Sequence, residues 1–154
     1  MKIILLAVGR VRVPYFREGC EDYLRRIRKL TPIEVREIKA VKGADAGSTR
    51  KAEGEKIAEA LGSIAMKSVA LHDRGKALTS EEFAKLVGNV ESSGAKGLVF
   101  VMGGAYGLSR EALEKADYLV SLGPMTMSHE LARLALLEQI YRAQTALRGV
   151  PYPK

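Results

Sequence analysis

The chain has 154 residues, 47% of them hydrophobic and 28% charged, which fits one globular domain and excludes a disordered chain or an appended recognition module. Its formal charge of +7 gathers in residues 1–50, where 12 Lys and Arg stand against 6 Asp and Glu, and this imbalance suits either a polyanion-facing surface or a basic face that is merely solvated. Cys20 is the only cysteine, so an internal disulfide is excluded and a reducing compartment is expected.

The first third of the chain predicts a strand, a helix and a second strand. Residues 2–8 form a continuous apolar run that ends at Gly9, the profile of a strand buried on both faces. Pro14 can occupy the first turn of an amphipathic helix that runs to about Lys29. Residues 33–40 alternate apolar and charged side chains, which favours a half-exposed strand near an edge of the sheet.

The middle of the chain predicts a further helix and strand. Residues 43–47 are small and polar, as in a surface loop. Ser48 can cap a helix that Gly62 ends. Residues 67–72 then read as a third strand, from which residues 73–76 turn away.

The rest of the chain continues the same alternation. Residues 79–82 are an acid-rich helix start, and the helix they open ends before Gly94. The remaining elements are expected as a strand over residues 96–102, a short helix over 109–116, a strand over 117–122, and a long helix that Ser128 caps and that runs to about Leu147. Alternation of this kind predicts an α/β fold with a parallel sheet and helices on both faces.

Two glycine-containing segments interrupt apolar runs in the last third of the chain. Residues 103–109 follow the fourth expected strand, and residues 122–130 follow the fifth. We expect these loops side by side at the carboxyl edge of the sheet, where open α/β folds bind ligands. Their spacing is neither G-x-G-x-x-G nor a P-loop, which disfavours phosphate binding. The glycines either let the backbone approach a flat, mostly neutral group such as adenine or are ordinary turn residues.

The final helix has an apolar surface wider than one stripe. Its apolar positions are Leu131, Leu134, Leu137 and Ile140, widened by Ala135, Leu136 and Tyr141. Such a helix either buries one face against a second subunit, which favours a symmetric dimer, or is the central helix of a monomer. Glu138 is either a partly desolvated carboxylate suited to act as a base or the ion-pair partner of Arg142 one turn later.

Signals for metal binding, nucleophilic catalysis and membrane insertion are missing from the sequence. His72 and His129 are the only histidines, and no metal-ligand spacing appears. No G-x-S-x-G nucleophile elbow is present. The apolar residues 3–8 are too few for a signal peptide or a bilayer span. We therefore expect a soluble, cytoplasmic protein with no bound metal and no membrane partner.

Three blocks of the sequence together resemble one known family. They are Gly-Gly-Ala-Tyr-Gly-Leu-Ser at residues 103–109, the loop of residues 121–127, and the helix motif His129-Glu-Leu-Ala-Arg-x-x-Leu-x-Glu138-Gln-x-Tyr141-Arg142. The chain resembles the RlmH (formerly YbeA) family of the SPOUT superfamily. The resemblance extends over the whole chain, from the first strand to Pro151 and Tyr152.

The resemblance implies a fold, an assembly and a cofactor. The implied fold is a parallel-sheet SPOUT fold with a carboxyl-terminal trefoil knot, a known exception to the rule against knotted chains, as one domain over residues 1–154. The implied assembly is a homodimer in which the tail of one subunit completes the site of the other. The implied cofactor is S-adenosyl-L-methionine, held by backbone groups of loops at Leu71, Gly103, Leu122, Gly123, Pro124, Met125, Thr126 and Met127.

The resemblance also implies a reaction, the methylation of N3 of pseudouridine 1915 in helix 69 of 23S rRNA on the assembled ribosome. The N3–H group lies between two carbonyls and must lose its proton before it attacks, whereas a sulfonium methyl is already activated and needs no metal. We assign positioning or proton removal to Glu138 or Tyr152. His129 is a third catalytic candidate, or else fixes its loop. Arg133 and Arg142 are expected to contact RNA or the base anion.

The tail departs from the family pattern. The family usually ends Pro-Tyr-His followed by a basic residue, whereas this chain ends Pro151-Tyr152-Pro153-Lys154. Proline offers no side-chain donor or acceptor, so any role of that histidine is lost, while Tyr152 and Lys154 can still act. Without a separate RNA-binding module, the ribosome is expected to contact Lys154 and the basic first helix, at Arg25 and Arg26.

The sequence leaves three alternative functions open. A non-catalytic ribosome- or RNA-binding protein of the same fold would not need a cofactor pocket. A SPOUT methyltransferase that acts on another RNA, such as tRNA, is expected to carry an extra RNA-binding domain. A nucleotide- or flavin-binding α/β protein is a more distant alternative.

Overall fold

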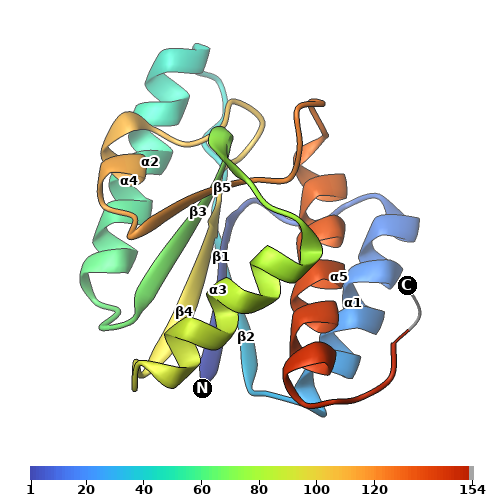
Figure 1. The fold of residues 1–154 in the computed structure, drawn as a ribbon. Coiled ribbons are helices and arrows are strands. Elements are labelled where there is room, and N and C mark those ends of the chain that lie inside the picture. Colours follow the sequence, from blue (N-terminus) through green and yellow to red (C-terminus); the bar gives the residue numbers. More distant parts are fainter. Residues whose placement is uncertain (153–154) are drawn as a thin grey trace.

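The computed structural model describes residues 1–152 and contains one five-stranded, all-parallel sheet in the order β2-β1-β4-β3-β5 (Figure 1). The strands are β1 (Lys2–Val8), β2 (Ile33–Ile38), β3 (Lys67–Ala77), β4 (Gly97–Met102) and β5 (Tyr118–Ser121). The helices are α1 (Pro14–Arg28), α2 (Ala46–Gly62), α3 (Ser80–Ser92), α4 (Arg110–Glu114) and α5 (His129–Leu147). The predicted alternation of strands and helices and the parallel sheet are confirmed.

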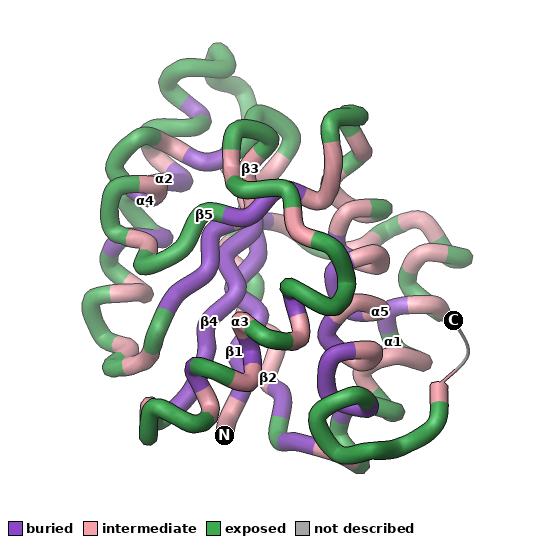
Figure 2. Tube along the Cα trace, in the orientation of Figure 1, coloured by how far each residue is buried: buried purple, intermediate pink, exposed green. Residues whose placement is uncertain are grey.

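Two hydrophobic cores lie on opposite faces of this sheet. Alternate residues of β1 divide between them: Ile3 and Leu5 pack with residues from α1, α3 and α5, whereas Ile4 and Leu6 pack with residues from α2 and α4. Figure 1 shows α2 and α4 on one side of the sheet and α1 and α5 on the other. Strands β1 and β4 are buried along nearly their whole length (Figure 2), as the continuous apolar runs predict, whereas β3 is buried only at residues 68–70.

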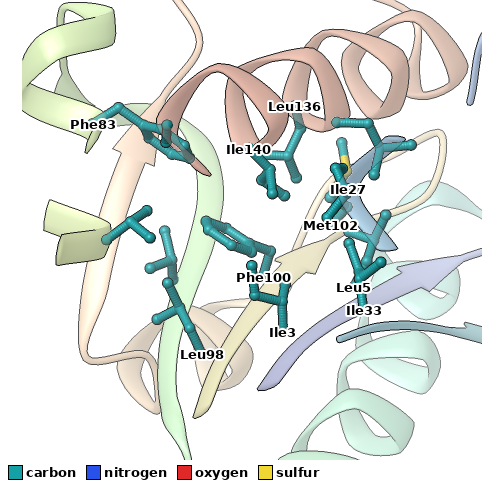
Figure 3. Packing of buried hydrophobic residues seen from close by; sticks show 14 of the residues in the cluster. Ile3, Leu5, Ile27, Ile33, Phe83, Leu98, Phe100, Met102, Leu136 and Ile140 are labelled. Carbon is teal, nitrogen blue, oxygen red and sulfur yellow. The ribbon is translucent and has the colours of Figure 1, made fainter. Parts of the chain in front are cut away.

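The larger core forms under α5. Phe100 of β4 and Ile3 of β1 point toward Leu136 and Ile140 of α5, and Phe83 of α3 stacks on Phe100 with 5.7 Å between ring centroids (Figure 3). All five side chains are at most 4% exposed. Burial of this extent stabilises the sheet–helix layer and fixes the position of α5 on this face of the sheet.

Two predicted helix starts are confirmed and one is corrected. Thr79 and Glu82 form a capping box at the start of α3, and Ser128 accepts a hydrogen bond from the Leu131 N–H at the start of α5. The cap of α2 is Asp45, whose side chain accepts from the Ser48 N–H at 2.9 Å, and not Ser48 as predicted. A carboxylate at this position satisfies a free N–H as well as a hydroxyl does.

The prediction that residues 73–76 turn away from the third strand is wrong. Strand β3 continues to Ala77, with a bulge in which both Leu71 and Lys76 align with Val120 of β5. Gly75 makes this possible, because a Cβ there would lie 2.6 Å from the Val120 carbonyl carbon. The bulge keeps the chain beside β5 up to the point where the last loop begins.

The wide apolar surface of α5 is covered mainly within the chain. The helix packs on the sheet and contacts both α1 and α3. Leu136, Leu137 and Ile140 are buried, whereas Leu131, predicted to belong to the apolar face of this helix, is 39% exposed. Contacts within the chain therefore cover most of the apolar surface of α5, and its width is explained without a second subunit.

Helices long and apolar enough to cross a lipid bilayer are absent from residues 1–152.

Candidate active site

Three adjacent strands end at one edge of the sheet. The registers align Ala70 of β3 with Val101 of β4, and Leu71 with Val120 of β5. Gly103 and Leu122 consequently lie just beyond the carboxyl ends of β4 and β5, and Leu71 is the residue of β3 at which the bulge begins, level with the end of β4. The expected shared carboxyl edge is confirmed, but the expectation that the loops lie side by side is wrong: β3 lies between β4 and β5, so the two glycine-containing loops flank it.

A cleft of about 550 Å³ opens between α3, the end of β5 and α5. Its walls are Tyr23, Leu78, Ser80, Phe83, Val120, Ser121, Leu122, Leu131, Leu134, Ala135, Glu138 and Gln139. Two residues predicted to act at the site, Leu122 in the last loop and Glu138 in α5, therefore line the same cavity. Leu71 and Gly103 lie at the same sheet edge but outside the walls of this cleft.

The loop after β4 folds tightly on itself. Gly104 and Gly107 form an isolated antiparallel bridge, in which the Gly107 N–H donates to the Gly104 carbonyl oxygen at 3.1 Å. Gly107 has φ +78°, and a Cβ on Gly103 would lie 2.4 Å from the Gly107 carbonyl carbon. Gly103 and Gly107 are therefore required by the geometry of this loop and are more than ordinary turn residues, because the loop can close only where these two positions carry no side chain.

The loop after β5 is anchored at its start and open at its tip. The buried Ser121 hydroxyl accepts from the Gly123 N–H at 3.1 Å and donates to the Gly123 carbonyl oxygen at 2.9 Å. Gly123 has φ +132°, a conformation that favours glycine. Further along, Met125 is 80% exposed. A fixed start and an exposed apolar tip suit a loop that folds over a ligand or a partner.

Glu138 is the centre of a hydrogen-bonded cluster at the floor of the cleft. Its Oε1 accepts from Arg142 Nη2 at 2.6 Å and from the Tyr152 hydroxyl at 3.2 Å, and its Oε2 accepts from Gln139 Nε2 at 2.7 Å. Tyr152 also shares a hydrogen bond of 3.2 Å with the Tyr23 hydroxyl. The structure confirms the ion pair of Glu138 with Arg142, and the Glu138 side chain is only 20% exposed.

The aromatic neighbours of Tyr152 hold it over Glu138. The Tyr152 ring meets Tyr141 edge-on at 4.9 Å between centroids, and the Arg142 guanidinium carbon lies 4.7 Å from the Tyr152 ring centroid. Burial, then the hydrogen bond with Tyr23 and the charge of Glu138, raise the pKa of Tyr152 above its ordinary value. The pKa of Arg142 is raised chiefly by its hydrogen bond to Glu138. Tyr152 therefore keeps its proton here.

The predicted basic and histidine residues fall in different places. Arg133 is 4% exposed and donates to Glu37 and to the Gly9 carbonyl oxygen, both at 2.8 Å, so this guanidinium holds the fold together and is not presented to RNA as predicted. Arg25 and Arg26 are exposed, and each forms an ion pair with Asp22. His129 is the first residue of α5. Lys154 and Pro153 lie outside the described residues.

Sequence reasoning missed part of the cleft. Gln139 is bound at both ends, because its Nε2 donates to Glu138 and its Oε1 accepts from the Ser80 hydroxyl at 2.7 Å. Ser80 lies 59 positions earlier in the chain, so no local pattern indicates this contact. Tyr23 likewise reaches the cluster from α1. The adjacency of Gln139 to Glu138 on α5 was the only available signal.

Within residues 1–152, no three His, Cys, Asp or Glu side chains gather as potential metal ligands. The cleft instead offers a carboxylate, a guanidinium, hydroxyls and an apolar wall. This donor set can orient an organic substrate, accept a proton and stabilise an anion.

Comparisons with known proteins agree with this geometry. A family model described as "Predicted SPOUT methyltransferase" matches residues 1–153. The ribosomal RNA large subunit methyltransferase H of Carboxydothermus hydrogenoformans is 44% identical over 100% of both chains, and that of Syntrophotalea carbinolica is 41% identical over 99% of this chain and 98% of its own.

Solved structures resemble this fold at low sequence identity. A probable methylase family protein from Haemophilus influenzae superimposes with a TM-score of 0.57 at 14% identity and covers 99% of this chain and 71% of its own. A probable methyltransferase from Bordetella pertussis gives a TM-score of 0.56 at 15% identity over 92% of this chain and 95% of its own. At such identities the likeness shows the fold alone.

Proposed function

Because this chain belongs to the SPOUT methyltransferases, and within them to the RlmH family of large-subunit ribosomal RNA methyltransferases, we propose that it methylates N3 of pseudouridine 1915 in helix 69 of 23S rRNA on the assembled ribosome. The observation that carries this proposal is the cleft shared by Leu122 and Glu138. Leu122 belongs to the proposed cofactor loop and Glu138 is the proposed proton acceptor, so their common cavity is what methyl transfer to a nitrogen acid requires.

The chain fits S-adenosylmethionine as its methyl donor. We assign its binding to Leu71, to Gly103 and to residues 122–127, whose backbone groups would hold the adenine. The tight closure of Gly103 on Gly107 leaves bare backbone at the edge of the sheet, and Leu122, Leu131 and Leu134 give the cleft an apolar wall. When bound, S-adenosylmethionine supplies a methyl group that is already activated by its sulfonium charge.

The chemistry of this chain's own residues follows from the Glu138 cluster. Glu138 accepts the N3 proton of the base, because its carboxylate lies in the cleft and Tyr152 stays protonated. Arg142, 2.6 Å from Glu138, keeps a positive charge beside the site as the base becomes an anion. The Tyr152 hydroxyl donates to Glu138 and orients it. His129, at the start of α5, stays a candidate for contact with the base or for fixing its own loop.

A homodimer with the trefoil knot is part of the proposal. Large apolar side chains are exposed at one end of the molecule: Tyr15 at the start of α1, Met125 before α5, and Leu131 in the first turn of α5. The two helix starts are neighbours, since Glu130 accepts hydrogen bonds from the Arg12 and Val13 N–H groups. A second copy can cover this end. The partner's tail is not needed to reach Glu138, because Tyr152 of the same chain already contacts it. Sedimentation equilibrium should give twice the 16.8 kDa chain mass; a monomer mass at micromolar concentration would contradict the dimer.

The test uses ribosomes from a strain that lacks the endogenous enzyme. The protein and labelled S-adenosylmethionine are added, the rRNA is digested, and the nucleosides are identified by mass spectrometry. We expect N3-methylpseudouridine from 23S rRNA with the unaltered protein, and a rate lower by about 10²–10⁴-fold with Glu138→Gln.

Each rival function gives a different result in this assay. No methylated nucleoside, together with no binding of S-adenosylmethionine, favours a non-catalytic ribosome-binding protein. Methylation that appears only when tRNA or another RNA is supplied favours a different substrate.

A further inference from the structure

Glu53 is a buried carboxylate outside the cleft. It lies in α2, on the face of the sheet opposite α5, and is 3% exposed. Its Oε2 accepts from the Val41 N–H at 3.1 Å, in the loop that follows β2. Within the described residues, its Oε1 is buried and has no hydrogen-bond partner. A buried acceptor without a donor is unfavourable and calls for a reason.

The unpartnered oxygen faces the glycine loop after β4. A Cβ built on Gly104 would lie 3.1 Å from Glu53 Oε1 and 3.1 Å from Val8 Cγ1, so Glu53 lies directly behind that residue. The same helix meets the exit of the loop, because a Cβ on Gly54 would lie 1.9 Å from Ser109 Oγ. The loop of residues 103–109 therefore rests on α2 at both ends, and within residues 1–152 the one buried side-chain polar atom on that surface without a partner is Glu53 Oε1.

We infer that Glu53 is a positioning residue for the methyl donor: its free oxygen accepts a backbone N–H of the loop of residues 103–107 when that loop closes on S-adenosylmethionine. This inference rests on the proposed function, since it needs the cofactor at Gly103. It explains why a carboxylate stands at this position. Two N–H groups, that of Val41 and one from the loop, require two acceptor oxygens, and a neutral amide offers only one.

A consequence is that Glu53 joins two loops at the carboxyl edge of the sheet. The loop after β2 carries the exposed Lys39 and Lys42 on either side of Val41. Closure of the glycine loop is thereby linked to a basic segment at the same edge, through one side chain. We expect this link through Glu53 to affect cofactor affinity before any other property, because the loop N–H donates to Glu53 only in the closed state.

The test compares Glu53→Gln with Glu55→Gln, an exposed carboxylate two positions along the same helix. The dissociation constant of S-adenosylmethionine is measured by calorimetry, and the melting temperature is measured with and without saturating cofactor. We expect Glu53→Gln to weaken cofactor binding about tenfold, as loss of one charge-assisted hydrogen bond predicts. The melting temperature gained from the cofactor should shrink accordingly. Glu55→Gln should match the unaltered protein.

Wild-type affinity in a folded Glu53→Gln variant overturns the inference, even if its melting temperature falls, because a purely structural role does not change cofactor affinity. Absence of binding by the unaltered protein instead overturns the proposed function. If Glu53→Gln does not fold, Gly104→Ala and Glu53→Asp replace it in a double-mutant cycle. Non-additive effects of the two changes on cofactor affinity support the inference, and additive effects overturn it.

Discussion

The guanidinium of Arg133 lies buried beneath the loop after β1, where it contacts Glu37 and the Gly9 carbonyl oxygen. Replacing it by methionine removes both contacts and leaves two acceptors without their donor. Because the Glu37 side chain is 36% exposed, water can solvate part of the loss. We expect Arg133→Met to lower the free energy of unfolding by about 2 kcal/mol, measured by urea denaturation.

The control for this change is Arg10→Met. Arg10 lies 3.9 Å from the same Glu37 carboxylate but its side chain is 83% exposed. An exposed ion pair contributes little, so this variant should stay within about 0.5 kcal/mol of the unaltered protein. Equal effects of the two substitutions would mean that Arg133 is not a structural cation.

Tyr152 offers a second test at the scale of one residue. Tyr152→Phe keeps the ring contacts with Tyr141 and Arg142 but removes the hydroxyl that donates to Glu138. If that hydroxyl orients the proton acceptor, kcat for methyl transfer should fall about tenfold, while the cofactor dissociation constant stays unchanged. Stopped-flow or quench measurements with saturating ribosomes provide kcat. A change in cofactor affinity alone would assign Tyr152 to the binding loop instead.

At the level of secondary-structure elements, the bulge of β3 sets the position of β5 and of the cofactor loop beyond it. A Cβ on Gly75 would press on the Val120 backbone, which cannot yield as a side chain can. Gly75→Ala should therefore cost about 3 kcal/mol of unfolding free energy and weaken cofactor binding. Gly62→Ala at the end of α2 is the matched control, since nothing lies within 4 Å of its Cβ. Thermal and urea unfolding of both variants measure the difference.

The start of β5 is tied to the start of β3 by Asp117. Its carboxylate accepts from the Lys67 ammonium, the Ser68 N–H and the Ser68 hydroxyl at 2.8–3.0 Å. Burial raises the pKa of Asp117, but the hydrogen bonds from Lys67 and Ser68 lower it more, so it lies below its ordinary 3.8. A carboxylate with a depressed pKa stabilises the fold above its unfolded pKa, and this stabilisation disappears as pH falls through its folded pKa.

Asp117→Asn should consequently cost about 1 kcal/mol at neutral pH and almost nothing near pH 2. Urea denaturation of both proteins at several pH values measures the difference. A constant difference between variant and unaltered protein across this range would show that the charge of Asp117 contributes nothing.

The sequence predicted elements better than it predicted their junctions. Apolar periodicity located every strand and helix, because burial on one or two faces leaves a period of 2, a continuous run or a period of 3.6 in the chain. The bulge at residues 71–76 was missed because Asp73, Arg74 and Gly75 have turn composition. The alignment of Leu71 and Lys76 with Val120, which continues β3 beyond them, is a contact between distant segments. Asp45 was missed as a cap because Ser48 satisfies the same local rule.

At the scale of the whole molecule, the part of the candidate site that could be predicted is the part that the order of parallel strands brings together. Parallel strands bring the loops after β4 and β5 to one edge whatever their side chains are, so that shared edge could be predicted from the strand–helix alternation. The partners of Glu138 include Tyr152, which arrives from the tail, and Gln139, which is held by Ser80 of α3. Those contacts depend on how α5 packs between α1 and α3, which no local pattern contains. Likewise, nothing in the composition distinguishes the buried Arg133 from the exposed Arg25.

The exposed arginines of α1 are the proposed contact with the ribosome. Arg25 and Arg26 are exposed but share Asp22, whose pKa is lowered chiefly by its hydrogen bond with Arg25. Asp22 therefore keeps its charge, and the pair of arginines presents a net positive charge to RNA phosphates. Arg25→Glu with Arg26→Glu should weaken ribosome binding at least tenfold in low salt and flatten its salt dependence, while cofactor affinity is unchanged. Filter binding over a salt series measures both the affinity and its salt dependence.

The charge-matched control is Lys51→Glu with Lys56→Glu, on the exposed side of α2. If the control weakens binding equally, only the net charge of the protein matters, and α1 is not the docking surface.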